Sequence, residues 1–362
     1  MSVLSAPHFH NEAAAFERVE SVIWPNGPIC HHCGCTDRIK AIPANPEKRV
    51  RYGLKRCGDC GKQFTVRMGT IFEESKLPLH IWLQAMHLMA ASKKGVSAHQ
   101  LHRTLEITYK SAWFLAHRIR EAMRSGDLAP FGSGGGAVEA DETFISREPG
   151  TEVKRAWHHK AKVLTLVDRE SGRTRSMVVD DLQARTVLPI LQANIAREAR
   201  VMTDEAVHYK SVHRLFAEHG KVNHKADEYV SQTDPTVFTN TVEGYFSIFK
   251  RGMKGVYQHC SKKHLHRYMA EFDFRYSNRV ALGVDDQERA QRALAGVVGR
   301  RLTYQRTGEG RPNAGPGRKR RWRPEATPNT SDQLEFPFGD DGQEAHRKKC
   351  HGARELNSSG RS

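Results

Sequence analysis

Long hydrophobic runs are missing from this sequence. No apolar stretch approaches the ~20 residues that cross a membrane, and residues 1–20 lack the hydrophobic core of a signal peptide. These absences predict a cytoplasmic protein without a membrane partner. Cysteine is also scarce, at seven in 362 residues, and four of the seven form two CxxC pairs. Such spacing fits a reducing compartment better than a disulfide scaffold.

Negative charge is in the minority. The chain has 57 Lys and Arg against 41 Asp and Glu, which gives a formal net charge of +16. This balance favours a polyanionic partner such as nucleic acid, although a solvated basic surface without such a partner gives the same composition. A chain of this length can hold two or three domains.

Two common catalytic motifs are absent. The chain contains no HExxH sequence, which many zinc hydrolases carry. The glycine-rich segment Gly132–Gly136 is not followed by the Lys-Ser/Thr pair of a phosphate-binding loop. We interpret this segment as a hinge between a binding part and a catalytic part.

The two CxxC pairs are Cys30-His-His-Cys33 and Cys57-Gly-Asp-Cys60, and a glycine follows each pair. Two-residue spacing lets both thiolates of a pair face one ion, and four thiolates form a closed tetrahedral structural zinc site. A redox CxxC or a chance repeat is the alternative, but two such pairs favour zinc. The sequence therefore predicts a zinc ribbon with Cys30, Cys33, Cys57 and Cys60 as ligands.

Three helical patterns follow the ribbon. Helices are expected at Leu79–Ala91, Ser97–Leu105 and Thr108–Met123, and the last two start at a residue type that caps helices. A helix-turn-helix would present its final helix to a DNA groove, whereas any three-helix packing unit gives the same spacing. The residues that we expect on the groove face are Lys110, Ser111, Phe114, His117 and Arg118.

Acidic residues lie in or directly after two predicted strands. Asp141 lies in the strand-like segment Ala137–Ile145, and Asp204 directly follows the short strand 200–203. With further strands and helices between and after them, the order is β-β-β-α-β-α, the ribonuclease H-like arrangement. In it the first and fourth strands are neighbours, so Asp141 and Asp204 can meet. The remaining predicted elements are strands at 162–168 and 173–179 and helices at 184–196 and 206–217.

A third acidic residue, Glu243, opens a predicted helix. Asn240 three residues earlier has the spacing of a capping box, so Glu243 either only caps the helix or serves as a third carboxylate. Lys250 follows two turns later on the same helical face, as a DNA contact or as an ordinary solvated lysine. Converging carboxylates can hold two divalent cations, which can clamp both oxygens of a phosphoryl displacement.

These residues resemble a known motif. Asp141, Asp204 and Glu243, followed by Lys250, resemble the DDE motif of the transposases of bacterial insertion sequences, in particular the branch with an N-terminal zinc ribbon. The resemblance covers about residues 25–285. Within it, the strongest similarity lies in Asn240–Met253 and Glu271–Tyr276.

The resemblance implies a DNA transposase that binds the terminal inverted repeats of its element, hydrolyses the strand at the ends and joins the 3′-OH to target DNA. It implies Asp141, Asp204 and Glu243 as ligands of two Mg²⁺ (or Mn²⁺) ions, with Lys250 near the DNA end. Some relatives carry Asn at the third position, which keeps Asn240 as an alternative ligand. Synapsis of two ends implies a homodimer or higher oligomer on DNA.

Two other classes stay open on the residues alone. A metal-dependent nuclease of the same fold uses the same acids to hydrolyse but never joins. A non-catalytic DNA-binding protein derived from a transposase keeps the binding parts, although the intact acids argue against it.

The predicted architecture is a multi-domain α+β protein acting at the bacterial nucleoid. Its basic C-terminal tail is expected to be disordered because Gly, Pro and charged residues dominate it. The predicted parts are an N-terminal segment (1–25), the zinc ribbon (26–70), a helix-turn-helix DNA-binding segment (71–130), a Gly-rich linker (131–136), the ribonuclease H-like α/β catalytic domain (137–290), and a C-terminal helix with the tail (291–362).

Overall fold

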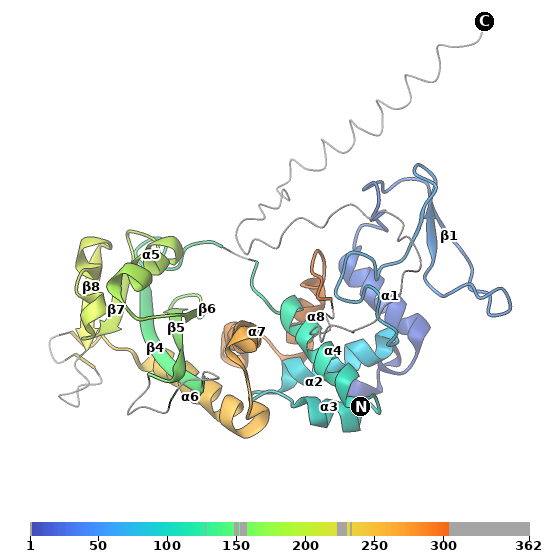
Figure 1. The fold of residues 1–362 in the computed structure, drawn as a ribbon. Helices are drawn as coiled ribbons and strands as arrows, with labels where there is room; N and C mark the ends of the chain where they lie inside the picture. Colours follow the sequence, from blue (N-terminus) through green and yellow to red (C-terminus); the bar gives the residue numbers. More distant parts are fainter. Residues whose placement is uncertain are drawn as a thin grey trace, which may run out of the picture. The chain divides into compact units, whose positions relative to one another are not determined.

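The computed structural model describes residues 2–126, 128–147, 152, 158–222, 230–231 and 234–303 (Figure 1). The chain forms two compact units. One is built from the residues up to Asn26 together with Val66–Leu302, and the other contains Gly27–Thr65. No helix in these described ranges is long and apolar enough to cross a membrane. The predicted basic tail lies outside the described residues.

The unit that contains Gly27–Thr65 is a small antiparallel sheet that brings the CxxC pairs together. In each pair the N–H of the following glycine donates to the carbonyl of the first cysteine, Gly34 to Cys30 at 2.8 Å and Gly61 to Cys57 at 3.0 Å. Both glycines have positive φ, 75° and 71°, where a side chain would be strained. This is the predicted zinc ribbon. Its strands, in the order β1-β2-β3, are β1 (Ile39–Ala41), β2 (Lys55–Cys57) and β3 (Gln63–Phe64).

Five helices of the other unit share one hydrophobic core. The bounds of α2 and the caps of α3 and α4 agree with the sequence prediction. The hydroxyls of Ser97 and Thr108 accept the N–H groups of Gln100 and Ser111 at 3.1 and 3.2 Å. The helices are α1 (Glu12–Ile23), α2 (Leu79–Ala91), α3 (Ala98–Thr104), α4 (Tyr109–Ala122) and α8 (Asp286–Ala295), and 3-10 turns at Val3–Ser5 and Pro7–Phe9 precede them.

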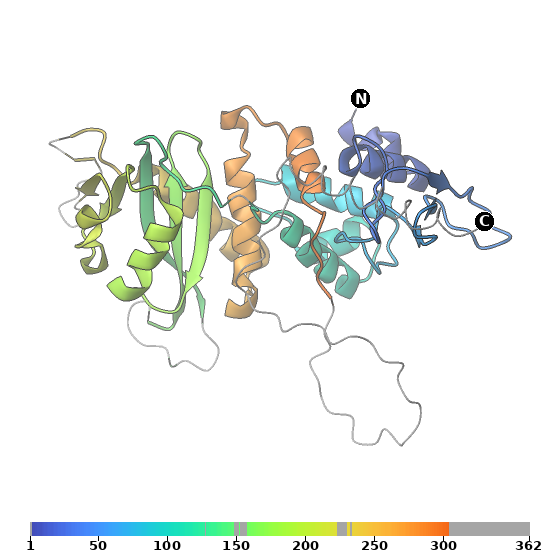
Figure 2. The same ribbon diagram turned by 90° about the horizontal axis from the view of Figure 1, so that it is seen from above.

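A five-stranded mixed sheet carries Asp141 and Asp204, and Figure 2 shows this sheet from above. Its order is β6-β5-β4-β7-β8, and β4 pairs antiparallel with β5 and parallel with β7. The first and fourth strands of this sheet are therefore neighbours, which confirms the predicted ribonuclease H-like fold. The strands are β4 (Ala137–Arg147), β5 (Lys160–Asp168), β6 (Thr174–Val179), β7 (Arg200–Asp204) and β8 (Glu218–Val222).

Helices cover both faces of this sheet (Figures 1 and 2). On one face, α5 (Ala184–Asn194) packs over Val138, Leu164 and Leu166. The other face carries Val163 and Val167, which pack against α6 and α7. The elements around them are α6 (Asn240–Gly252), a π-helical turn (Met253–Tyr257), α7 (Lys262–Ser277) and a 3-10 turn (Val280–Leu282).

The helix predicted at residues 206–217 is wrong. This segment forms two short 3-10 turns, η3 (Val207–Tyr209) and η4 (Val212–Arg214), and the chain then adds the edge strand β8. Tyr209 and Val212 are buried against the α5 face, so tertiary packing decides the local conformation here.

The segment Gly132–Gly136, predicted as a hinge, is ordered in the structure. Phe131 is buried, and its backbone exchanges hydrogen bonds of 2.9 Å with Asn194 and Ala196. Gly132 has φ +70°, and a Cβ there would lie 2.5 Å from the Cβ of Ala199. The segment is therefore an ordered turn anchored on the sheet.

The last described helix returns to the helical core. Ala293 and Leu294 of α8 are buried with residues of α1, α2 and α4. The six-part division of the chain stays a prediction, but residues on both sides of the proposed boundary at 290 belong to this one helix.

Candidate active site

The parallel ladder between β4 and β7 brings two acidic residues together. Its last paired residues are Glu139 and Met202, and Asp141 and Asp204 lie two positions further along their strands. One carboxylate oxygen each from Asp141, Asp204 and Glu142 lies within 4.8 Å of the others. The prediction that Asp141 and Asp204 lie close together is therefore confirmed.

The electrostatics of this cluster favour a bound cation or proton. Burial, followed by the negative charge of Glu142, raises the pKa of Asp141 to about 8. The N–H of Glu142, which donates to Asp141 Oδ1 at 2.7 Å, acts against this rise. The charges of Asp204 and Glu243 add to it, so the carboxylate of Glu243 acts on the same site.

Glu243 lies in the first turn of α6 and is not one of the three acids whose oxygens cluster within 4.8 Å. Its Oε1 accepts the hydroxyl of Thr239 at 3.3 Å. The residue that precedes the helix is Thr239, and Asn240 is already its first helical residue. The predicted capping box between Asn240 and Glu243 is therefore not formed. The N–H of Val242 donates instead to Oε2 of Glu139 on β4, at 2.9 Å.

Three residues of the site escaped the sequence reasoning. Glu142 is buried to 6 % side-chain exposure, and its Oε1 accepts the hydroxyl of Tyr209 at 2.5 Å and a ring N–H of His208. Burial lowers the pKa of His208, but the hydrogen bond to Glu142 and the charges of Glu142, Asp204 and Asp141 outweigh it and the net shift is upward. The only sequence signal was the position of His208 and Tyr209 shortly after Asp204.

The predicted DNA-contacting residues fall into two groups. Lys250 is exposed on α6, with its Nζ 5.8 Å from the ring centre of Phe246, and Lys110 is exposed on α4. Arg118 is only 4 % exposed, donates to the carbonyl of Glu73 at 2.5 Å and lies 5.4 Å from the ring centre of Trp82. The prediction that Arg118 faces a DNA groove is therefore wrong, because this side chain is part of the core.

His117 is a second correction on α4. Its side chain is fully buried among Trp113, His264 and Tyr268 and does not face a groove. Burial, followed by the charge of Arg120, lowers the pKa of His117 to about 2, so the ring is neutral. Phe114 and Ser111, by contrast, are partly exposed.

The four cysteines of the ribbon form the second cluster of potential metal ligands in the described part of the chain. Their sulfurs lie within 4.8 Å of one another, with Cys30 and Cys60 3.7 Å apart and Cys33 and Cys57 3.6 Å apart. Four thiols at these distances match the donor set of a structural zinc site. The neighbouring Cys35 is buried and is not part of the cluster.

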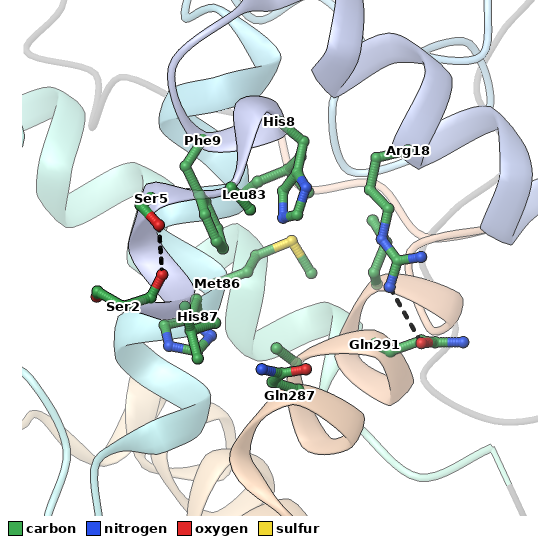
Figure 3. A pocket seen from close by; sticks show the side chains of 14 residues that line it. Ser2, Ser5, His8, Phe9, Arg18, Leu83, Met86, His87, Gln287 and Gln291 are labelled. Carbon is green, nitrogen blue, oxygen red and sulfur yellow. Dashed lines mark hydrogen bonds between the residues drawn. The ribbon is translucent and has the colours of Figure 1, made fainter.

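A cavity of about 340 Å³ lies elsewhere, where α1, α2 and α8 meet (Figure 3). Phe9 and Met86 form its apolar wall, His87 lines it, and Arg18 donates to Gln291 at its edge. None of its lining residues belongs to the carboxylate cluster, so it plays no part in the chemistry described here.

Comparison with known proteins agrees with the geometry. Residues 134–277 match the ISXO2-like transposase domain, and residues 10–63 match the transposase zinc-ribbon domain. A protein of Halobacterium salinarum described as an uncharacterized protein in transposable element ISH50 is 26% identical over 290 residues, which is 74% of this chain and 91% of that protein.

Among solved structures, a chain of the simian T-cell lymphotropic virus intasome in complex with PP2A regulatory subunit B56 gamma matches 48% of this chain and 67% of its own length. Its identity of 14% and TM-score of 0.26 are too low to carry an argument. The matched residue ranges are decisive, because they contain the four ribbon cysteines and the acids Asp141, Asp204 and Glu243. The chain belongs to the ISXO2-like DDE transposases of insertion sequences, in the branch with an N-terminal zinc ribbon.

Proposed function

We propose that this transposase binds the terminal inverted repeats of its insertion sequence, hydrolyses the strand at the element's ends and joins the freed 3′-OH to target DNA. The observation that carries this proposal is the convergence of Asp141 and Asp204 from neighbouring strands, within reach of the negative charge of Glu243, which adds to the rise in the pKa of Asp141. Because the substrate is DNA, we expect the protein to act at the bacterial nucleoid.

The donor set of the site fits hard divalent cations. Carboxylate oxygens are the ligands that Mg²⁺ and Mn²⁺ prefer. Burial, and after it the negative charges of the neighbouring acids, raise the pKa of Asp141, and a bound positive charge would oppose both effects. Asp141, Asp204 and Glu243 would hold the cations, two per site. When bound, such cations lower the pKa of an attacking hydroxyl and stabilise the leaving 3′-oxygen.

The chain's own residues would bind and orient the DNA. Lys250 lies on the exposed face of α6 two turns after Glu243, where it can contact a phosphate next to the scissile bond. Water attack releases a 3′-OH, and that hydroxyl then displaces a 3′-oxygen in the target strand. No side chain becomes covalently attached to DNA in either step.

The remaining parts would hold the ends. We assign terminal-repeat binding to the zinc ribbon, with Zn²⁺ on Cys30, Cys33, Cys57 and Cys60, and to the helix-turn-helix of α3 and α4 with Lys110 on its exposed side. Two ends must be held together for joining, so we expect a homodimer or higher oligomer on DNA.

The proposal is tested by incubating the full-length protein with DNA that flanks its own gene and Mg²⁺, followed by mapping of the cleaved ends. We expect cleavage at the element's ends, and joining when pre-cleaved ends are supplied with a target plasmid. Hydrolysis without joining would instead identify a nuclease. Binding without any nicking would identify a non-catalytic DNA-binding protein.

A further inference from the structure

We propose that Glu139 and Arg169 are positioning residues for Glu243, because together they fix the start of α6 against β4, the strand that carries Asp141. The inference rests on the proposed function, since it gives Glu243 a place in the carboxylate site. Backbone hydrogen bonds between strands set the spacing of Asp141 and Asp204. Glu243 comes from a helix outside that ladder. Its carboxylate accepts the Thr239 hydroxyl at 3.3 Å, and the position of both residues depends on what holds the start of α6.

Glu139 provides the first contact. It lies on the same face of β4 as Asp141, two residues earlier, and is fully buried. Its Oε2 accepts the N–H of Val242 at 2.9 Å, and its Oε1 accepts Nε of Arg169 at 2.6 Å. The Val242 N–H is one of the first amides of α6, which have no partner inside the helix. Glu139 therefore caps α6 from the sheet, where a negative charge also suits the helix dipole.

Arg169 extends this contact to the segment before the helix. Its two terminal nitrogens donate to the carbonyls of Thr236 at 2.6 Å and Phe238 at 2.5 Å. Its guanidinium carbon also lies 3.6 Å from the centre of the Phe238 ring. One planar guanidinium thus joins the buried carboxylate of Glu139 to two carbonyls on the path into α6. A buried carboxylate of this kind is tolerated because both of its oxygens are paired.

The contact of Val242 matters for the site because Val242 and Glu243 are neighbours in the chain. Val242 directly precedes Glu243, so a loss of the Val242–Glu139 hydrogen bond releases the backbone that carries the Glu243 carboxylate. Residues that orient metal ligands without touching the metal typically change metal affinity by about 10–100-fold when they are replaced. Glu139 and Arg169 are expected to behave in this way toward Glu243.

Two substitutions separate this role from the fold. Glu139→Gln keeps the shape and one acceptor for the Val242 N–H, but places an amide N–H against the Nε–H of Arg169. Arg169→Lys keeps the charge beside Glu139 but cannot reach the two carbonyls in fork geometry. Arg267→Lys is the matched control. Arg267 pairs with Glu121 at 2.7 Å with similar exposure, 17 % against 15 % for Arg169, and this ion pair joins α7 to α4 instead of α6 to the sheet.

The experiment uses the full chain without DNA. Hydrogen exchange without added Mg²⁺ or Mn²⁺ reports on residues 236–243, and electron paramagnetic resonance of free Mn²⁺ gives the affinity of the site. In both variants we expect exchange about 10-fold faster in this segment and Mn²⁺ affinity lower on the order of 10-fold. Arg267→Lys should match the wild type in both measurements.

The positioning role would be overturned if a folded variant exchanged hydrogen at the wild-type rate in this segment. It would also be overturned if exchange were faster but the Mn²⁺ affinity were unchanged. If Glu139→Gln does not fold, the partly exposed Arg169→Lys decides the question. If the wild-type protein bound Mn²⁺ but never cleaved the element's ends, the proposed function would be contradicted. The comparison of exchange rates and Mn²⁺ affinities between the variants would still test the positioning role.

Discussion

Asp141 of β4 and Asp204 of β7 occupy equivalent positions on two parallel neighbouring strands, each two residues beyond the paired Glu139 and Met202. The sheet therefore fixes the separation of the two backbones. Backbone N–H groups hold the carboxylates themselves, since Glu142 donates to Asp141 Oδ1 at 2.7 Å and Ala206 donates to Asp204 Oδ1 at 2.9 Å. In our proposal, Glu243 depends on the contact of α6 with that same strand, where Glu139 accepts the N–H of Val242. The proposed site then combines two carboxylates placed by the sheet with one placed by the start of a helix.

The three acids are expected to act as one unit. Asp141→Asn, Asp204→Asn and Glu243→Gln should each fold and bind DNA, yet lose nicking and joining by orders of magnitude, because a neutral amide removes charge from a cation site. Double variants should lose little more than single ones. Cleavage of labelled ends with Mg²⁺ and with Mn²⁺ measures this, and gel shift checks binding.

Glu205→Gln is the matched control for the acids. Glu205 is the exposed neighbour of Asp204, and its amide variant should keep wild-type cleavage. Near-normal activity of Glu243→Gln would remove Glu243 from the site and turn attention to Asn240.

Lys250 is expected to contribute through a phosphate contact. Lys250→Ala should cut correctly bound ends about 5–10-fold more slowly, since a charge-assisted contact is worth on the order of 1 kcal/mol. The slope of log affinity against log salt should fall by about 0.9 if one phosphate contact is lost. Lys221→Ala, on the exposed edge strand β8, is the control. An unchanged rate and slope for Lys250→Ala would make Lys250 an ordinary surface lysine.

The sequence was sufficient wherever local chemistry decides the structure. Apolar spacing and cap residues predicted α2, α3 and α4 to within about a residue, and Ser97 and Thr108 form the expected caps. The predicted order of strands and helices placed Asp141 beside Asp204, because only a few sheet topologies are compatible with that order.

The sequence was insufficient where distant contacts decide the structure. The edge strand β8, Glu-His-Gly-Lys-Val, has no alternating apolar pattern. A Cβ on its Gly220 would lie 2.5 Å from Sδ of Met202 on the neighbouring strand, so only glycine fits there. This close packing against β7 could not be read from the residues of β8 alone. The cap of α6 comes from Glu139, about a hundred residues earlier in the chain.

The sequence also did not reveal which charged residues are buried. Arg118 has the helical position of a groove-facing residue, and only the packing of Trp82 and the carbonyl of Glu73 shows that it faces inward. The role of Glu142 was masked by its neighbour Asp141, because alternation along a strand predicts opposite faces for them. Their carboxylates still approach each other at the end of the sheet.

The ribbon is expected to bind one Zn²⁺ per chain. Cys57→Ser should lower zinc content and unfold the ribbon, because folding of such small sheets is linked to their metal. Elemental analysis of protein purified without chelator measures the content. Cys260→Ser, at a buried cysteine outside the ribbon, should leave zinc at wild-type level. Protein without zinc, or a Cys57→Ser variant with full zinc, would contradict the assignment.

His117 is expected to limit stability in acid. Its two ring nitrogens have no hydrogen-bond partner, and its pKa falls from 6.5 to about 2 in the folded chain. The unfolded chain therefore binds a proton below pH 6.5 that the folded chain does not. The free energy of unfolding is therefore unaffected by His117 above pH 6.5. It falls by about 1.4 kcal/mol per pH unit as the pH drops from 6.5 toward 2. His117→Phe should remove this loss between pH 6.5 and 5.

The same substitution should also stabilise the protein at neutral pH. An apolar ring of similar shape removes two unsatisfied polar atoms, an effect of about 1–3 kcal/mol. Urea unfolding at several pH values measures both effects. His99→Phe, at an exposed histidine stacked on Tyr109 at 4.3 Å, should change neither. An acid sensitivity of His117→Phe equal to that of the wild type would show that another group controls unfolding in acid.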